Sequence, residues 1–197
     1  VHAAGADGGR SAGQVIAGGR GSGVSPTPPI RFQPAMKNAL TVDLEDWYHP
    51  ELVRKHIRGD VESQIVDSTN QILRLLDRHR VKATFFLLGA VARKHPMLIR
   101  TIHDKGHEIA SHGMSHTPLW ELEYDGLDKE LKTFDKLMAD ILGNQVKIKG
   151  FRAPTFSMDN RTRYALKCLM DNQYLYDTSI FPAQNYMYGL NDAPCAV

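Results

Sequence analysis

The residues best suited to chemistry in this sequence occur in three short polar clusters. In chain order they are Asp43-Leu44-Glu45-Asp46-Trp47, Ser111-His112-Gly113-Met114-Ser115-His116 and Arg152-Ala153-Pro154-Thr155. His112 and His116 are four residues apart, so one helical turn or a tight loop brings both imidazoles to one side. Two imidazoles and a carboxylate are a common ligand set for a catalytic divalent cation. With an acidic cluster available, a metal site is a better interpretation than two surface histidines.

The acidic cluster offers both a ligand and a base. Carboxylates as close in the chain as Asp43, Glu45 and Asp46 repel one another, and a cation relieves that repulsion. A carboxylate that does not bind the cation is free to act as a general base. The same stretch could be a solvated acidic turn, although Trp47 beside it is a residue type that often lines a cleft. Arg152 could pair with Asp43 and keep it ionised, or could be a surface arginine before a turn.

Alternating strands and helices are predicted to position these clusters. Apolar runs predict strands at residues 39–42, 83–88, 107–110, 146–151 and 174–176, and helical spacing predicts helices at residues 65–78, 96–105, 127–142 and 161–170. This alternation is typical of βα units with a parallel sheet, so the predicted fold class is α/β. In parallel β/α barrels, functional residues collect at the carboxyl ends of the strands. Each cluster directly follows a predicted strand, so we expect the three clusters to converge in space.

Residues 1–35 differ in composition from the rest of the chain. They contain eight of the sixteen glycines and four of the ten prolines, with Phe32 as the only aromatic residue. Such a stretch buries too little apolar surface to offset its ordering entropy, so we expect disorder. It lacks the charged start and apolar run of a secretory signal. We interpret it as a flexible leader or as sequence translated from upstream of a start at Met36, with the folded domain beginning at residue 36.

Charge and hydropathy argue against two classes of function. Residues 1–35 carry three arginines and one aspartate, and the rest of the chain balances 21 basic against 21 acidic residues. A neutral domain of this kind is not expected to bind nucleic acid. No run approaches the roughly 20 apolar residues of a membrane-spanning helix. The two cysteines, Cys168 and Cys195, predict no disulfide framework, and a cytoplasmic location is the default expectation.

Taken in order, the three clusters resemble the motifs of the NodB-type polysaccharide deacetylases, carbohydrate esterase family 4. The family pattern Ser-His-Gly-x-x-His is matched at every fixed position by residues 111–116, and Arg-x-Pro is matched by residues 152–154. The first family motif, Thr-Phe-Asp-Asp-Gly, corresponds to Thr41-Val42-Asp43-Leu44-Glu45-Asp46-Trp47. That form is similar to bacterial deacetylases associated with exopolysaccharide loci, as is the later stretch at residues 176–182.

The resemblance implies a distorted (β/α) barrel of the NodB-homology type in a bacterial protein. Five predicted strands are too few to close a barrel. The family also has a general-acid histidine near the end of its domain, and nothing resembling that motif follows Pro194. We therefore expect residues 36–197 to be the N-terminal part of the deacetylase domain, and the barrel to be incomplete in this chain.

The resemblance also implies roles for individual residues. Asp43 corresponds to the catalytic base, and Arg152 corresponds to the residue that positions it. His112 and His116 correspond to two ligands of one divalent metal. Zinc is the expected metal, and cobalt and nickel suit the same nitrogen and oxygen donors.

The third metal ligand is left open by the sequence. Leu44 stands where the family motif has an aspartate. Strand alternation places Glu45 on the same side as Asp43, whereas a bend at the strand end would present Asp46 instead. The residues expected to contact substrate are Trp47, Pro154 and Thr155.

The function implied is a metal-dependent hydrolase that removes N-acetyl groups from a polysaccharide or an N-acetylated amino sugar. Its partner would be a carbohydrate substrate, and the chain by itself is expected to be weakly active or inactive. One alternative is an allantoinase-like amidohydrolase that acts on a small cyclic amide. Another is a non-catalytic carbohydrate-binding domain.

Overall fold

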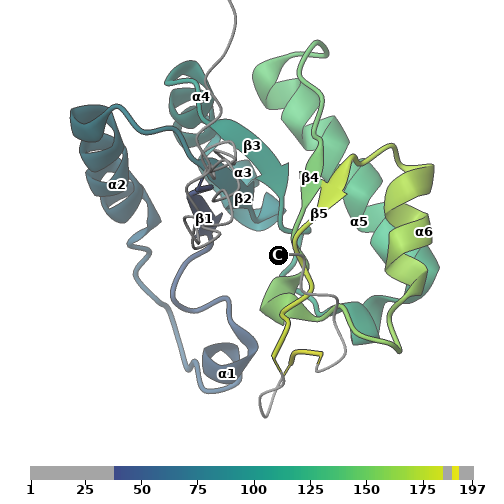
Figure 1. Cartoon of the computed structure of the whole chain (residues 1–197). Coiled ribbons are helices and arrows are strands. Elements are labelled where there is room, and N and C mark those ends of the chain that lie inside the picture. Colours follow the sequence, from purple (N-terminus) through teal and green to yellow (C-terminus); the bar gives the residue numbers. More distant parts are fainter. Residues whose placement is uncertain (1–37, 184–187, 191–197) are drawn as a thin grey trace, which may run out of the picture. The chain divides into compact units, whose positions relative to one another are not determined.

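Five short parallel strands form the central sheet (Figure 1). They are β1 Thr41–Leu44, β2 Thr84–Leu87, β3 Glu108–Ser111, β4 Gly150–Phe151 and β5 Tyr176–Asp177. Their spatial order is their order in the chain, and every neighbouring pair is parallel. The predicted α/β class and parallel sheet are confirmed. Because β1 and β5 are the outer strands of the described sheet, the barrel is open, as expected for an incomplete one.

This computed structural model describes residues 38–183 and 188–190. The chain divides into two units, Val1–Lys37 and Asn38–Val197, and all the described residues belong to the second. The predicted leader at residues 1–35 and the predicted start at Met36 lie outside the described residues, as does Cys195. Within the described ranges, no helix has the length and apolar character needed to cross a membrane.

The predicted helices are present with shifted bounds. They are α2 Ile65–His79, α4 Pro96–Asp104, α5 Leu119–Leu142 and α6 Tyr164–Asp171. α5 begins well before the predicted Leu127, because tertiary contacts hold its first turn. The Leu119 N–H donates to Ser157 Oγ (3.0 Å), and the Tyr164 hydroxyl donates to the Leu119 carbonyl oxygen (2.5 Å). A kink at Glu123, with φ +52°, separates this turn from the apolar stripe that predicted the helix.

Three short helical segments were missed by the sequence pattern. They are α1 Glu51–Arg54, α3 Gly89–Lys94 and the 3₁₀ helix η1 Pro154–Phe156. α3 follows β2 almost directly because the N–H groups of Gly89 and Ala90 donate to the carbonyl oxygens of Gly113 and Met114, each at 2.9 Å. Conversely, the strand predicted at residues 146–151 shortens to β4. These features depend on contacts between distant segments, which local periodicity does not report.

Alternation along the strands separates a core face from a site face. Leu44, Phe85 and Leu87 belong to the hydrophobic core that the sheet shares with its flanking helices. Asp43 and Phe86 are partners in the register of β1 and β2. Because successive strand residues point to opposite faces, these two side chains lie on the face away from that core. The sheet thereby presents an acidic residue beside an aromatic one.

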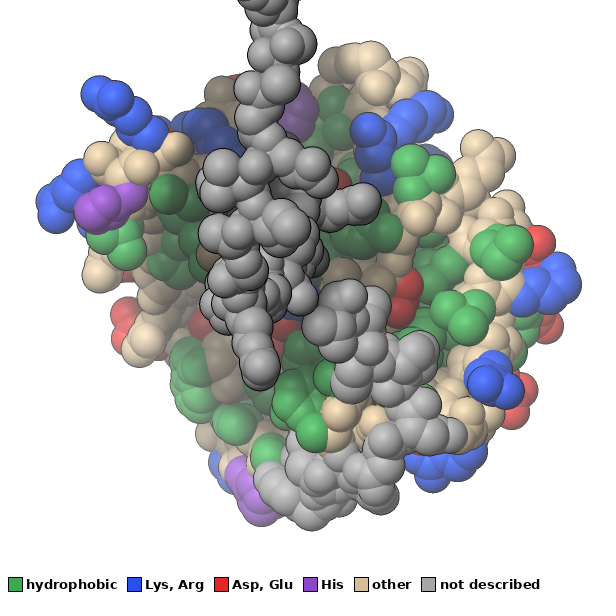
Figure 2. Space-filling view, viewed as in Figure 1, with side chains coloured by type: hydrophobic (Ala, Val, Ile, Leu, Met, Phe, Trp, Pro, Cys, Tyr) green, Lys and Arg blue, Asp and Glu red, His purple; other side chains and the backbone are tan. Residues whose placement is uncertain are grey.

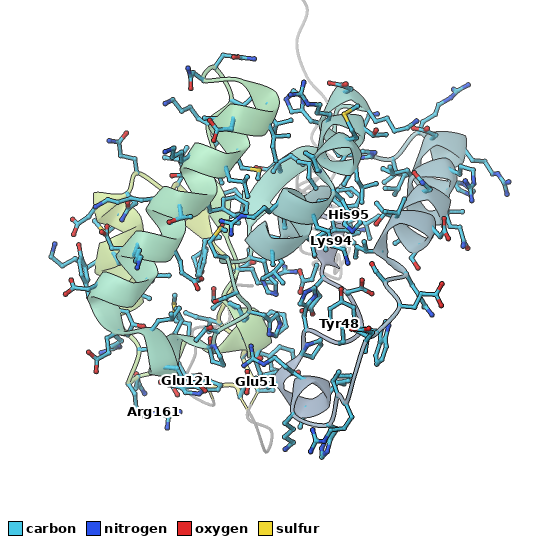
Figure 3. The ribbon with its side chains drawn as sticks, turned by 180° about the vertical axis from the view of Figure 1, so that it is seen from behind. Tyr48, Glu51, Lys94, His95, Glu121 and Arg161 are labelled. Atoms are coloured by element: carbon cyan, nitrogen blue, oxygen red, sulfur yellow. The ribbon has the colours of Figure 1, made fainter. Side chains whose placement is uncertain are left out.

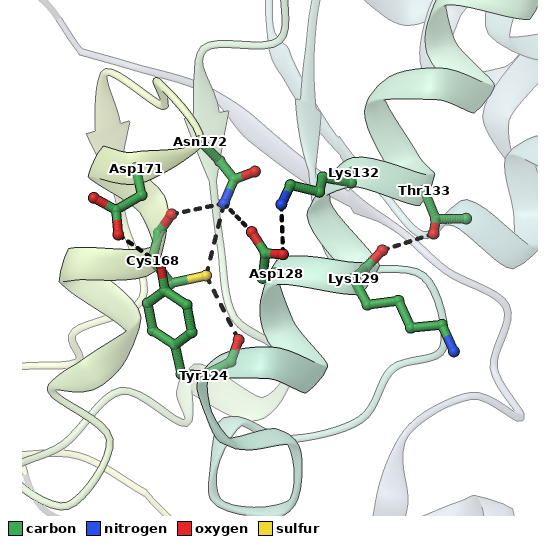
Figure 4. Close-up of polar contacts among 8 residues, drawn as sticks. All are labelled: Tyr124, Asp128, Lys129, Lys132, Thr133, Cys168, Asp171 and Asn172. Atoms are coloured by element: carbon green, nitrogen blue, oxygen red, sulfur yellow. Dashed lines mark hydrogen bonds and ion pairs between the residues drawn. The ribbon is translucent and has the colours of Figure 1, made fainter.

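Helices α5 and α6 are joined by a polar network that Figure 4 shows in close-up. The Asn172 side-chain amide donates to Asp128 Oδ1 and to the Cys168 carbonyl oxygen, each at 2.9 Å. The Tyr124 hydroxyl donates to Asp171 Oδ2 at 2.5 Å. Burial raises the pKa of the Cys168 thiol to about 11, so this cysteine is a neutral packing residue. The network fixes α6, which leads into β5.

On the face that Figure 2 presents, the visible Lys and Arg side chains lie mainly toward its edge.

Candidate metal centre and active site

Asp43 and Arg152 form an ion pair on the site face of the sheet. β1 runs two residues further than predicted, so Asp43 lies within the strand and not after it, whereas Arg152 directly follows β4. Arg152 Nη1 lies 2.6 Å from Asp43 Oδ1. A hydrogen bond from Nη1 to Thr41 Oγ1 (3.2 Å) and one from Nε to Thr178 Oγ1 (3.0 Å) hold the guanidinium. It also stacks on Phe86, with Cζ 4.1 Å from the ring centroid.

Glu45, His112 and His116 form a second group beside this pair. One potential ligand atom from each residue lies within 4.8 Å of the other two. Both histidines are buried, with exposed fractions of 2%, and their ring centroids are 5.5 Å apart. His116 Nε2 lies 2.7 Å from Glu45 Oε2. The three predicted strand-end clusters therefore meet, and the acidic cluster contributes Glu45 to the histidine pair.

His112 is oriented by the backbone of Arg152. Its Nδ1 lies 2.7 Å from the Arg152 carbonyl oxygen. Because a carbonyl oxygen only accepts hydrogen bonds, Nδ1 carries the proton and the Nε2 lone pair is free. Burial lowers the pKa of His112, which favours the neutral imidazole that binds metals. Arg152 thus fixes a carboxylate with its side chain and an imidazole with its main chain.

The donor set fits a divalent cation. Glu45 Oε2 is buried without a hydrogen-bond partner among the described residues, although it lies close to His116 Nε2. A buried carboxylate oxygen without a donor is costly, and a cation would relieve that cost. One carboxylate and two imidazoles form the kind of three-ligand set that leaves an open position in catalytic zinc sites. The residues present are therefore suited to hold a metal.

Asp46 lies outside this group and binds a different part of the chain. Its Oδ1 accepts hydrogen bonds from the backbone N–H groups of Trp47 and Gln64, each at 3.2 Å, and its Oδ2 accepts one from Ser63 Oγ. Burial by itself would raise the pKa of Asp46, but these hydrogen bonds outweigh it and lower that pKa overall. Of the two candidates for the third ligand, the geometry therefore favours Glu45. Asp46 instead ties the segment after β1 to the start of α2.

Tyr48, Lys94 and His95 line a small hollow beside Asp46. Figure 3 labels all three: Tyr48 lies on the segment after β1, Lys94 is the last residue of α3, and His95 follows it. The backbone N–H of Asp46 donates to His49 Nδ1 at 2.8 Å. The turn that follows Glu45 is therefore held by this backbone bond and by the bonds that the Asp46 carboxylate accepts from Ser63 and Gln64.

Because Asp46 ties the segment after β1 to the start of α2, we expect its replacement to affect stability more than metal affinity. We expect Asp46→Ala to lower the free energy of unfolding by about 1–3 kcal/mol, since the N–H of Gln64 and the hydroxyl of Ser63 lose a buried partner. For a domain of this size that corresponds to roughly 2–4 °C in melting temperature per kcal/mol. Thermal unfolding monitored by circular dichroism measures it.

Ser63→Ala is the matched control for this prediction. It removes one of the bonds to Asp46 and leaves the carboxylate in place. We expect a smaller loss of stability in the same direction. A metal affinity that collapses in Asp46→Ala while the melting temperature stays constant would make Asp46 a ligand and contradict the anchor role.

A pocket of about 210 Å³ opens over the paired groups. It is lined by Asp43, Glu45, Pro50, Glu51, Leu52, His112, His116, Ala153, Thr155, Phe156 and Tyr188. Thr155, expected to contact substrate, lies here with its backbone in the left-handed region (φ +58°). Glu51 and Leu52 were missed, because no pattern in the sequence marks them, and Tyr188, which belongs to a stretch that resembles the family, was not expected in the site. Phe156 could have been found from its position next to the third cluster.

Trp47 and Pro154, the other two expected substrate contacts, are not among the residues that line this pocket. The Trp47 indole N–H donates to the Glu62 carbonyl oxygen at 3.1 Å, which draws the ring toward the segment before α2. Pro154 is buried and begins η1. Neither residue lines this pocket, because a hydrogen bond directs the Trp47 ring elsewhere and Pro154 is buried, so their contact with substrate stays a prediction.

Comparison with known proteins places this geometry in a family. A family model described as polysaccharide deacetylase matches residues 56–170, which is more than half of the chain. The chain belongs to the polysaccharide deacetylase family. The match includes His112, His116 and Arg152 and begins after Asp43 and Glu45. The whole first cluster, residues 43–47, lies before the matched region, so its place in the site rests on the geometry of the structure.

Two curated polysaccharide deacetylases show the extent of the likeness. A chitooligosaccharide deacetylase of Rhizobium leguminosarum bv. trifolii is 42% identical over 64 residues, which are 32% of this chain and 30% of the relative. A peptidoglycan-N-acetylglucosamine deacetylase of Bacillus cereus is 31% identical over 102 residues, which are 51% of this chain and 36% of the relative. The chain spans about a third of the length of these relatives.

A solved structure of this family shares the fold. A Mycobacterium smegmatis protein described as a polysaccharide deacetylase superposes with a TM-score of 0.61 and 29% identity. The match covers 72% of this chain and 50% of that one. The open parallel sheet described above is thus part of the NodB-type barrel expected from the sequence.

Proposed function

We propose that this chain carries the metal-binding site of an enzyme that hydrolyses N-acetyl groups on a polysaccharide or N-acetylated amino sugar. The observation that carries the proposal is the convergence of Asp43, Glu45, His112 and His116 in one pocket, with Arg152 contacting both Asp43 and His112. The named relatives, which act on chitooligosaccharides and on peptidoglycan, support a polymer of amino sugars as the substrate class.

In this proposal Asp43 is the general base. It is partly exposed to the pocket, and Arg152 holds one of its oxygens. The guanidinium fixes the rotamer of the carboxylate, whose other oxygen can accept a proton from an attacking water. Attack on the acetamide carbon and cleavage of the C–N bond give acetate and a free amine, with the amine taking up a proton.

Glu45, His112 and His116 would hold the cation. A divalent ion bound there supplies Lewis-acid polarisation of the substrate carbonyl and a lower pKa for a nearby water. Zinc is proposed because a carboxylate and two imidazoles with an open position suit its catalytic sites. The hydrogen bond from His112 to the Arg152 carbonyl keeps the imidazole in the tautomer that such a site needs.

Metal removal tests the proposal. Acetate release from N-acetylated chitooligosaccharides should be abolished by a chelator and restored by Zn²⁺ or Co²⁺, as followed by a coupled acetate assay. The chelated protein should retain its circular dichroism spectrum, since the hydrophobic core does not include the metal-binding side chains.

Three outcomes would contradict this function. Acetate release that chelation leaves unchanged would remove the metal from the reaction. Hydrolysis of a small cyclic amide, with none of the oligosaccharide, would select an allantoinase-like activity. Sugar binding without any acetate release, in metal-loaded protein that spans the whole deacetylase domain, would indicate a non-catalytic domain.

A further inference from the structure

Glu130, which no sequence motif singled out, reaches the metal-binding loop from α5. Its Oε2 accepts a hydrogen bond from the Met114 backbone N–H at 2.8 Å, and its Oε1 accepts one from the Ser115 hydroxyl. Ser115 Oγ is also 2.8 Å from Thr117 Oγ1. Since the Ser115 proton is directed to Glu130, the Thr117 hydroxyl donates in that second bond. One carboxylate therefore binds two consecutive residues of the loop between His112 and His116.

This loop has a backbone that requires support. Gly113 has φ +75° and His116 has φ +57°. His116, a candidate metal ligand, therefore adopts the left-handed conformation that favours glycine. Such conformations persist when surrounding contacts over-determine them. A Cβ at Gly113 would lie 2.9 Å from Glu130 Oε2, so the glycine also makes room for the carboxylate.

The opposite side of the loop is held by α3. Gly89 and Ala90 donate their N–H groups to the carbonyl oxygens of Gly113 and Met114. These contacts occupy carbonyl groups of the loop, and the Met114 N–H donates to Glu130. Met114 is therefore hydrogen-bonded through both its N–H and its carbonyl oxygen. The loop is then fixed just before the residue that approaches Glu45.

We propose that Glu130 is a positioning residue that sets the direction of the His116 imidazole for metal binding. The proposal rests on the metal site of the proposed function. Glu130 itself is not one of the three residues that offer ligand atoms, and it acts through Met114 and Ser115. Partners that orient metal ligands in this way typically change metal affinity about 10–100-fold when they are removed.

Titration of the apoprotein with Co²⁺ alone tests the role, because the visible spectrum of Co²⁺ reports ligand geometry as well as affinity. We expect Glu130→Ala to bind Co²⁺ about 10–100-fold more weakly than the unaltered chain, with an altered visible spectrum. Glu130→Gln should be intermediate, because an amide offers only one oxygen and its NH₂ cannot accept the second bond. Asp140 is an exposed carboxylate on the same helix, so Asp140→Asn is the matched control. Its Co²⁺ affinity and spectrum should equal those of the unaltered chain.

If Glu130→Ala does not fold, Glu130→Gln and Ser115→Ala decide the question in protein whose circular dichroism is native. Equal affinity and an identical spectrum in these variants and in Asp140→Asn would overturn the role of Glu130 alone. If the unaltered chain binds no Co²⁺, the proposed metal site fails, and the role of Glu130 fails with it. If it binds Co²⁺ but releases no acetate, weaker binding in the Glu130 variants still supports the positioning role.

Discussion

Asp43→Asn will lower the rate of acetate release about 10²–10⁴-fold, which is the usual contribution of general acid–base catalysis. Asparagine keeps the size of aspartate and an oxygen for the bond from Arg152 Nη1, but it does not accept a proton from water. Because Asp43 is not one of the three residues grouped as metal ligands, metal affinity should change little. Initial rates and Zn²⁺ affinity, measured on the same preparation, check both parts.

Asp67→Asn is the matched control, since Asp67 is an exposed carboxylate on α2. It should keep the rate of the unaltered protein. The base assignment would be wrong if Asp43→Asn turned over normally. It would also be wrong if the variant lost metal in proportion to activity, because Asp43 would then act as a ligand.

Removing either imidazole will produce the second large effect, a loss of metal. His112→Ala and His116→Ala each delete one of three ligands. The affinity for Zn²⁺ should therefore fall by more than the roughly 100-fold loss reached when a residue that only orients a ligand is removed. Activity should disappear with the metal. Competition with a zinc chelator of known affinity measures the change.

His79→Ala is the control for this pair, because His79 is an exposed histidine at the end of α2. His112 is buried, so its removal also leaves the Arg152 carbonyl oxygen without a partner, and melting temperature must be measured alongside affinity. Unchanged zinc affinity in folded His112→Ala and His116→Ala proteins would refute the site.

The convergence of the three clusters was predictable from the sequence. Each polar stretch lies at the carboxyl end of a segment with strand-like periodicity, and parallel strands bring those ends to one edge. Asp43 was placed after its strand although it lies within β1, and this error did not matter, because alternation still points it away from the core.

The choice between Glu45 and Asp46 was not predictable, because both are carboxylates at a strand end. It depends on Ser63 and Gln64, which lie 17 and 18 residues away and bind Asp46. The orientation of Trp47 depends in the same way on the Glu62 carbonyl oxygen. Such partners become visible only once the loop after β1 has folded against the start of α2.

The sequence by itself determined the α/β class, the parallel sheet and the identity of the groups that meet. Those properties follow from periodicity and residue type, which are local. Only the tertiary structure decided which carboxylate joins the histidines, that the Arg152 backbone orients His112, and that Glu130 supports the loop before His116. Each of these is a hydrogen bond or a close approach between distant segments, and its geometry exists only after the chain has packed.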